Sequence, residues 1–334
     1  MKNRAKYFLL TVIIVGIAVA LLFLLKNKEK PVSQLPTVTF RQGWFTYAGF
    51  AGEVYAMDNK IDSVNGIQLA VEQGADDIDP VKLVLAGKDD FGITSAEAIL
   101  TANEKGANLV IVGVVNYLSP TCFISLEKSG IKTPKDWEGK KVGILTGTET
   151  ETVYRTMVRE LKLNTKKISE VEAPYDLKTF INGAYDVYPG FYYSEPVSLD
   201  FQNIKYNVIK PSDYNVNLMG AVYFTTEKFA KEHSNETKAF VYSIAKGWEL
   251  AIANPEIAIR KLYAYDNKID TVRELISLKK GIDYFKGEDN KTLYASNKTI
   301  REELSALYFL KKIKDTTNTN AFQLKNVELY HANK

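Results

Sequence analysis

From residue 36 onward, short runs rich in β-branched and aromatic residues alternate with segments of helical periodicity, and this alternation limits the fold more than any other feature of the chain. Over 148–162, for example, Val153, Met157 and Leu161 recur every four residues on one helical face. Such alternation is typical of an α/β protein with mostly parallel strands. The strands expected on this basis are 37–40, 66–71, 90–94, 109–115, 121–126, 141–145, 186–191, 205–209 and 220–225, and the later helices are 235–252, 268–280 and 298–312.

The chain of 334 residues is long enough to form two lobes, each with its own core. Two strong strands, 109–117 and 220–225, are placed where the chain could cross between such lobes. On that arrangement lobe 1 is discontinuous, over 37–118 and 218–334, and lobe 2 is inserted into it, over 119–217. The sequence therefore predicts a two-lobed α/β clamp with two interlobe crossings.

Charge and the rare residues exclude several classes of function. Residues 1–30 carry six Lys and Arg against one acidic residue, and the rest of the chain has 37 basic and 39 acidic residues, too balanced for a nucleic-acid groove. Cys122 is the single cysteine, which excludes an intrachain disulfide and favours a small buried hydrophobe over a reactive thiol. His233 and His331 are the only histidines, so we expect no histidine triad, no zinc site and no cofactor.

The amino-terminal segment contains an uncharged apolar run over 7–25, preceded by three basic residues. Nineteen helical residues would reach about 28 Å, close to the roughly 30 Å hydrocarbon core of a bilayer. The bulky residues at the end of the run favour an uncleaved anchor, and a cleaved signal peptide is the alternative. No cysteine follows the run, which excludes a lipid anchor. We expect residues 1–30 to be this anchor or signal, a transmembrane helix over 7–25, and 31–36 to be a tether.

Several phrases of the sequence resemble solute-binding proteins of ABC transporters. They are the Trp44-Phe45 pair after the first strand and the segments 86–94, 129–143, 224–229 and 245–256. The segment 129–143 contains the sequence Ser-Gly-Ile-Lys-Thr-Pro-Lys-Asp-Trp-Glu-Gly-Lys. The resemblance covers about residues 37–280, and it is to the branch that includes thiamine-pyrimidine, riboflavin, nitrate, taurine and alkanesulfonate binders.

The resemblance implies a fold, partners and an orientation. Members of this branch have the periplasmic-binding-protein-like type II fold, in which two α/β lobes close by hinge motion over a small ligand in the cleft. They deliver that ligand to ABC permease and ATPase subunits. Basic residues flank the apolar run on both sides, so the positive-inside rule is nearly balanced. The resemblance favours an extracytoplasmic, periplasmic or cell-surface, position for the folded part.

An aromatic cluster follows the first expected strand and is a candidate ligand wall. Trp44, Phe45 and Tyr47 could stack on a flat heterocycle, because large rigid rings offer much apolar contact at small entropic cost. Core packing after a strand is the alternative. In the pyrimidine-binding relatives a Trp at this motif faces the ligand, which favours Trp44 over the other two.

Two further candidate groups belong to lobe 1 and to the first crossing. Thr94, Ser95 and Glu97 end a strand and start a helix, at the edge of a sheet where α/β proteins bind ligands. Thr94 and Glu97 also have the spacing of a capping box, so helix capping is the competing interpretation. Asn116 lies at the first crossing, where its amide could bind ligand or serve only as a turn residue.

A second strand-to-helix turn contains Gly147, Thr148 and Glu149, which the resemblance places in a ligand-contacting loop. The glycine permits close backbone approach. Two Thr-x-x-Glu capping boxes overlap here, Thr146/Glu149 and Thr148/Glu151, and we expect one of them to cap the helix.

A second aromatic cluster ends the strand expected at 186–191. Tyr188, Phe191 and Tyr192 are candidates for the opposite wall, and Glu195 is a candidate hydrogen-bond acceptor for an exocyclic amine or a ring N–H. In the pyrimidine-binding relatives an aromatic-rich stretch ending in Glu occupies this place. The alternative for Glu195 is a first-turn helix acid beside Pro196.

The candidate walls carry Glu97, Glu149 and Glu195 and no Arg, whereas nitrate, taurine or a sulfonate would call for Arg or Lys donors. The sequence therefore predicts the solute-binding component of an ABC importer, with a small nitrogen-containing aromatic ligand of the thiamine-pyrimidine precursor type. Riboflavin, or a sulfonate or nitrate ligand, stays an alternative, as does a membrane-tethered sensing protein that uses the same clamp. An enzyme is not expected, because the fungal pyrimidine synthases of this fold depend on a cysteine-rich motif and a histidine.

Overall fold

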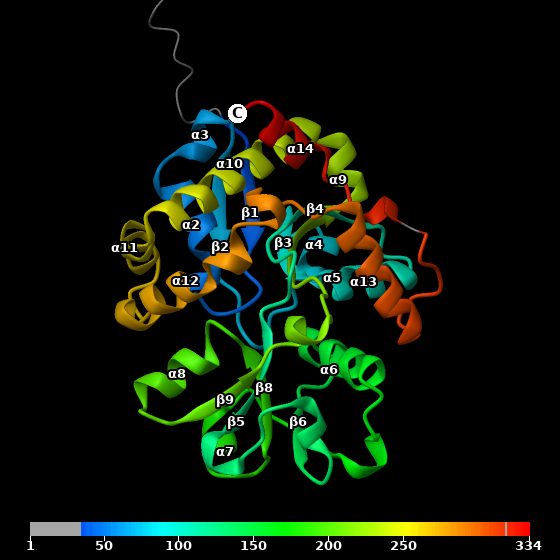
Figure 1. Ribbon diagram of the computed structural model, residues 1–334. Coiled ribbons are helices and arrows are strands. Elements are labelled where there is room, and N and C mark those ends of the chain that lie inside the picture. Colours follow the sequence, from blue (N-terminus) through cyan, green and yellow to red (C-terminus); the bar gives the residue numbers. More distant parts are fainter. Residues whose placement is uncertain (1–34, 318) are drawn as a thin grey trace, which may run out of the picture. The chain divides into compact units, whose positions relative to one another are not determined.

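The computed structural model describes residues 35–317 and 319–334 (Figure 1). The anchor predicted for 1–30, with its span over 7–25, lies outside these residues, as does most of the tether. Within the described part of the chain, no helix is both long and apolar enough to cross a membrane. Residues Thr37–Lys334 form one compact unit.

The described strands form two five-stranded sheets, one in each lobe. The lobe 1 sheet has the order β2-β1-β3-β10-β4, and the lobe 2 sheet has the order β7-β6-β8-β5-β9. The strands of the first sheet are β1 (Thr37–Arg41), β2 (Gln68–Glu72), β3 (Phe91–Ser95), β4 (Leu109–Val114) and β10 (Ala221–Thr226). The strands of the second are β5 (Thr121–Leu126), β6 (Lys141–Ile144), β7 (Ser169–Glu172), β8 (Val187–Phe191) and β9 (Tyr206–Ile209).

The expectation of mostly parallel strands is confirmed for strand direction, since four of the five described strands in each sheet run the same way. The fifth strand, β10 or β5, runs against them, so both sheets are mixed. Among the described strands, β1 pairs in parallel with β2 and β3, and β6 with β7 and β8, whereas β10 and β5 each pair antiparallel with both neighbours. The physical reason is the direction of entry. Both β5 and β10 follow an interlobe crossing, so each starts at the edge of its sheet where the other strands end.

All nine expected strands are present, with bounds within two residues of those expected. The sequence missed β7, whose Ser-Glu-Val-Glu segment is polar and largely exposed because it forms one edge of the sheet. Every strand of the second sheet lies within 119–217, and every strand of the first lies outside that range.

Helices flank both sheets in Figure 1. They are α2 (Ala51–Asp58), α3 (Ile61–Val64), α4 (Pro80–Leu85), α5 (Ala96–Glu104), α6 (Glu149–Glu160), α7 (Leu177–Ile181), α8 (Glu195–Phe201), α9 (Glu227–Glu232), α10 (Ser234–Ala253), α11 (Pro255–Tyr265), α12 (Thr271–Phe285), α13 (Asn297–Phe309) and α14 (Lys325–Ala332), with a single 3₁₀ turn, η2 (Ala48–Phe50), before α2. On α6, Val153 and Met157 are buried as the periodicity predicts. On α10, Phe240, Ile244 and Trp248 are fully buried.

The buried apolar residues form one core in lobe 1 and a core on each face of the lobe 2 sheet. The lobe 1 core includes one ring from lobe 2, Tyr193. One lobe 2 core includes Ala306, a residue of α13 near the end of the chain. The two lobes are therefore packed against each other at these points as well as joined by the chain.

Candidate ligand-binding site

Trp44 lies at a direct contact between the lobes. It follows β1 by three residues, and its half-buried ring lies 5.3 Å from the ring of Tyr175 in lobe 2, tilted by 43°. Phe45 meets Trp44 edge-on at 5.5 Å and is 52% exposed. The structure thus brings Trp44 to the boundary of the two lobes and leaves Phe45 beside it at the surface.

Tyr47 makes a second interlobe ring contact. Its ring lies 6.4 Å from that of Tyr193, with an angle of 21° between the ring planes. Burial raises the pKa of the Tyr47 hydroxyl above its usual value, and the nearby carboxyl of Glu195 adds to this effect. Tyr193 in turn packs on Tyr284 and Phe285 of α12, so the start of α8 in lobe 2 is seated on lobe 1.

Glu97 links the lobes through its carboxylate. It lies in the first turn of α5, accepts a hydrogen bond of 2.5 Å from Thr152 Oγ1 on α6, and forms an ion pair with Lys312. The capping box proposed for Thr94 and Glu97 does not form, because Thr94 lies inside β3. The N-cap is Ser95, whose Oγ accepts from the Ala98 N–H at 3.2 Å.

Glu149 is the first residue of α6 and faces the first crossing. Its carboxyl accepts hydrogen bonds from Ser119 and, at 3.4 Å, from Thr121 Oγ1. Desolvation by burial raises the pKa of this carboxyl to about 7, and the negative charge of Glu97 contributes to the rise. The group therefore titrates near neutral pH and faces a second acid across the lobe boundary.

Neither of the two capping boxes predicted at this turn forms. Thr148 is the N-cap by backbone conformation, but its hydroxyl donates to the Leu145 carbonyl oxygen and makes no cap hydrogen bond. The Thr146 hydroxyl donates to Glu172 on β7 instead of capping. Glu151 accepts from the N–H of Gly147 at 2.8 Å, and Gly147 adopts a left-handed φ of 78°, so the turn is closed by its own residues.

The buried side chain of Asn116 forms hydrogen bonds with two other segments of the chain near the interlobe crossings. Its amide donates to the Tyr284 carbonyl oxygen at 3.2 Å and accepts from the Ala221 N–H at 3.3 Å. Both ends of the side chain therefore have backbone partners on other elements. The structure gives Asn116 a clear role in joining the end of β4 to β10 and α12.

The second aromatic cluster divides between the core and the site. Tyr188 is buried in the lobe 2 core, where it stacks on Phe180 and Tyr185 and donates to the Pro174 carbonyl oxygen at 3.2 Å. The structure does not bring it to the wall opposite Trp44, because alternate residues of β8 point to opposite faces of the sheet.

Tyr192 stands among cations at the edge of the site. The ammonium groups of Lys280 and Lys210 lie 4.9 and 5.1 Å from the centre of its ring. Arg273 is also close enough to lower the pKa of Glu195, although its guanidinium is paired with Glu274 at 2.8 Å. The sequence shows no Arg on the candidate walls, and these cations come from α12 and from a loop that it did not connect with the site.

Glu195 begins α8 at the carboxyl end of β8. Its Oε2 accepts a hydrogen bond of 2.6 Å from the Phe191 N–H, which holds the carboxyl beside the strand end. Burial raises the pKa of this carboxyl. A Cβ at Gly190 would lie 2.7 Å from the same oxygen, so the glycine is what allows the carboxyl to approach the backbone.

Comparison with known proteins identifies the relatives of this fold. Residues 50–258 match the family described as NMT1/THI5 like. The chain belongs to this family. The formylaminopyrimidine-binding protein of Halalkalibacterium halodurans is 22% identical over 256 residues, which cover 75% of this chain and 77% of that protein. The predicted resemblance to solute-binding proteins of the pyrimidine and sulfonate branch is confirmed.

Two other relatives show the range of the NMT1/THI5-like fold. The periplasmic aliphatic sulphonate-binding protein SsuA from Escherichia coli superposes with a TM-score of 0.68 at 15% identity, covering 85% of this chain and 91% of that structure. The 4-amino-5-hydroxymethyl-2-methylpyrimidine phosphate synthase of Legionella pneumophila is 31% identical over 108 residues, 32% of this chain and 34% of that protein. The fold therefore occurs in binding proteins and is related to at least one enzyme.

Three residues that the structure places beside the candidate site were not selected from the sequence: Tyr175, Tyr193 and Glu303. Tyr175 follows β7, the strand that was not predicted, so nothing marked it as the end of a strand. Tyr193 was part of the recognised aromatic cluster, but only its neighbours were selected. Glu303 lies on the same face of α13 as Ile300 and Leu307, because these residues are spaced three and four apart. An acid on an apolar helical face could have been recognised from this spacing.

Glu303 completes a group of three acids at the crossings of the NMT1/THI5-like fold. It is 1% exposed, and its Oε2 accepts from the Met219 N–H at 2.9 Å, just before β10. Burial raises its pKa to about 8, and the charges of Glu149 and Glu97 contribute. The three carboxyls each have a hydrogen-bond donor, and Lys312 supplies the nearby positive charge.

Cys122 and the histidines of this NMT1/THI5-like chain take structural positions. Cys122 is fully buried in the lobe 2 core, as predicted, and burial raises the pKa of its thiol. His331 Nε2 lies 2.9 Å from the Thr292 carbonyl oxygen, and His233 stacks on Phe229. Among the described residues, no group of three His, Cys, Asp or Glu is arranged to hold a metal ion.

Proposed function

We propose that this protein is the extracytoplasmic solute-binding component of an ABC importer and that it binds a small, flat, nitrogen-containing heterocycle between its lobes. The observation that carries the proposal is the convergence of aromatic rings from both lobes beside a partly buried carboxyl. Trp44 meets Tyr175, Tyr47 meets Tyr193, and Glu195 lies near the second pair. Aromatic walls with a few fixed polar groups are typical of sites for flat ligands.

The pair of Trp44 and Tyr175 defines where the ligand ring would lie. Their ring centres are 5.3 Å apart and tilted, a direct contact between two aromatic groups. A planar ligand between two stacked rings needs them about 7 Å apart, two contacts of roughly 3.5 Å each. A modest separation of the lobes at this point would therefore admit one heterocycle, which would replace the contact between the protein rings with two of its own.

The polar groups favour a ligand with amine and ring-nitrogen atoms. Glu195 has a raised pKa, so it can accept from an exocyclic amine when ionised or donate to a ring nitrogen when protonated. An aminopyrimidine of the thiamine-precursor type offers both kinds of atom. The formylaminopyrimidine-binding relative supports this class of ligand.

A sulfonate or a related anion is the second candidate, and one observation favours it. Lys280 and Lys210 lie over Tyr192, and Arg273 is near Glu195. The pairing of Arg273 with Glu274 already neutralises much of its charge. Glu195 accepts from the Phe191 N–H and has further lone pairs on its carboxyl that an amine of the aminopyrimidine could use. For this reason we place the aminopyrimidine first.

The proposal extends to the position of the protein in the cell. We propose that the span over 7–25 anchors the protein in the membrane and that permease and ATPase subunits receive the ligand. Protease accessibility of the folded part in intact cells, compared with lysed cells, tests this placement.

Isothermal titration of the full-length protein with a panel of compounds tests the ligand class. The panel holds formylaminopyrimidine, hydroxymethyl aminopyrimidine, riboflavin, taurine and an alkanesulfonate. We expect binding of an aminopyrimidine and weaker or no binding of the anions. Tight binding of a sulfonate alone would favour the second candidate, and no heat with any of these compounds would refute the proposal.

A further inference from the structure

Helix α13 contacts both lobes, although its place in the chain assigns it to lobe 1. Ile300, Leu304 and Leu307 are at most 4% exposed and belong to the lobe 1 core. Ala306, on another face of the same helix, belongs to a core of lobe 2. Since residues three and four apart share a helical face, these contacts define two faces that pack on different lobes.

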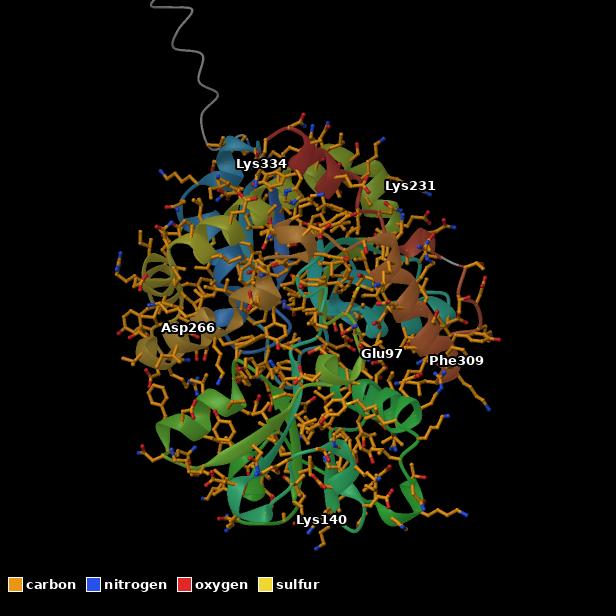
Figure 2. The ribbon with its side chains drawn as sticks, viewed as in Figure 1. Glu97, Lys140, Lys231, Asp266, Phe309 and Lys334 are labelled. Atoms are coloured by element: carbon orange, nitrogen blue, oxygen red, sulfur yellow. The ribbon has the colours of Figure 1, made fainter. Side chains whose placement is uncertain are left out.

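The end of α13 adds a second contact with lobe 2. The guanidinium of Arg159, on α6, lies over the ring of Phe309 at 3.8 Å from its centre. Phe309 lies three residues after Ala306, so it continues the face that meets lobe 2. Figure 2 labels Phe309 at the end of α13, and Figure 1 shows that end near α6.

The residues after α13 contact an acid of lobe 1 that also binds lobe 2. Lys312 pairs with Glu97 Oε1, and Glu97 Oε2 accepts from Thr152 on α6. The carboxylate therefore has one partner from the chain after α13 and one from lobe 2. Figure 2 shows Glu97 near the level at which the lobes meet.

We infer that α13 is a latch that holds the two lobes together across the cleft. Its apolar face fixes it to lobe 1, and its contacts with lobe 2 through Ala306 and Phe309 must be broken or rearranged when α6 moves away, as must the Thr152–Glu97 hydrogen bond beside it. Three large apolar side chains of α13 pack on lobe 1 and one Ala packs on lobe 2, so we expect α13 to stay with lobe 1 on opening. The helix lies beyond the residues 50–258 that match the family, whereas its partners Arg159 and Glu97 lie within them.

The latch has a consequence for any ligand. A contact that exists only when the lobes are together shifts the equilibrium toward that state by its own free energy. Loss of an exposed cation–π contact corresponds to about a two- to fivefold change in an equilibrium constant. The inference does not depend on the identity of the ligand, so it can be tested without one.

Distance measurements between spin labels on the two lobes of the full-length, ligand-free protein test the latch. Cysteines replacing the exposed Lys135 in lobe 2 and Lys231 in lobe 1 carry the labels, and buried Cys122 remains unlabelled. We expect Arg159→Ala and Phe309→Ala each to raise the ratio of long to short distances about two- to fivefold.

Arg155→Ala is the matched control, because Arg155 is on the same helix but pairs with Glu151 and Glu170 inside lobe 2. It should leave the distance distribution unchanged. The double variant Arg159→Ala/Phe309→Ala should be no more open than either single variant, since both remove the same contact. Distances unchanged in both single variants, or effects that simply add in the double variant, would overturn the latch.

Discussion

Glu303 is a buried acid on a helix that otherwise packs through apolar side chains. Burial raises its pKa to about 8, from a usual value of 4.5. Between these two values the unfolded chain loses the proton and the folded protein keeps it, so folding stability falls as pH rises. Above about pH 8 both states are ionised and the dependence from this group ends.

Glu303→Gln is expected to remove that pH dependence. The amide oxygen can still accept from the Met219 N–H, and the amide is neutral at every pH, whereas the wild-type carboxyl must bind a proton on folding below about pH 8. At pH 8 the variant should be more stable than wild type by on the order of 3 kcal/mol. Urea unfolding at pH 5 and pH 8 measures this difference. Glu302→Gln, an exposed neighbour on α13, is the control, and an equal response of the two variants would contradict the argument.

Tyr175 provides the sharpest test of the proposed ligand wall. Tyr175→Ala removes the ring opposite Trp44, and we expect the dissociation constant for the bound aminopyrimidine to rise about tenfold, the loss of one aromatic stacking contact and its buried area. Tyr175→Phe keeps the ring and should bind within about twofold of wild type. Fluorescence titration gives the constants. Tyr263→Ala, an exposed ring on α11, should have no effect.

The same ring shows where sequence reasoning about the site reached its limit. Trp44 could be selected because it follows a strand that the sequence marked clearly, and the structure places it at the lobe boundary. Tyr175 could not, because β7 is polar and was not recognised. Tyr188 was selected because it is aromatic, but both faces of β8 are covered by cores of lobe 2, and Tyr188 lies in one of them.

At the scale of elements, the contact between α2 and α10 depends on two glycines. A Cβ at Gly247 would lie 2.1 Å from the carbonyl oxygen of Gly52, and a Cβ at Gly52 would lie 2.4 Å from the ring of Trp248. Both distances are far shorter than any van der Waals contact. The atom nearest to a Cβ at Gly247 is a backbone oxygen, which cannot move away by a change of rotamer. The two helices can approach this closely only without these side chains.

Gly247→Ala should therefore destabilise the protein in spite of the better helix propensity of alanine. Overpacking of this kind costs about 1–3 kcal/mol, more than the roughly 1 kcal/mol gained from propensity. Chemical denaturation measures the net change. Lys246→Ala, next to it on the exposed side of α10, should change stability by less than about 0.5 kcal/mol. A Gly247→Ala protein as stable as wild type would show that α2 and α10 can separate freely.

The elements themselves were easier to predict than their partners. Periodicity located α6, α10, α12 and α13 because each has one buried face. It could not show that α13 has a second face in contact with lobe 2, because nothing in the sequence distinguishes Ala306 and Phe309 from the other residues of the helix. Nor could it assign strand direction, which depends on the order in which the chain enters each sheet.

At the scale of the whole molecule, acids from both lobes and from α13 meet at the crossings. Glu97 comes from lobe 1, Glu149 from lobe 2 and Glu303 from α13, and Lys312 is the cation paired with Glu97. Burial where the lobes touch disfavours the ionised forms of Glu149 and Glu303, and repulsion from the neighbouring acids adds to this effect. We therefore expect closing of the lobes to be coupled to the uptake of protons.

Ligand binding that closes the lobes should take up protons through Glu149. With the lobes in contact its pKa is about 7, and solvation in an open cleft would return it toward the usual 4.5, so closing at pH 7 would bind about half a proton. Below about pH 4.5 the group is protonated in both states, and well above pH 7 it is ionised in both, so the coupling is limited to the range between. Titration calorimetry in buffers of different ionisation enthalpy measures this uptake directly. Glu149→Gln should reduce it while leaving Glu303 in place, and an unchanged proton count in that variant would show that the coupling comes from another group.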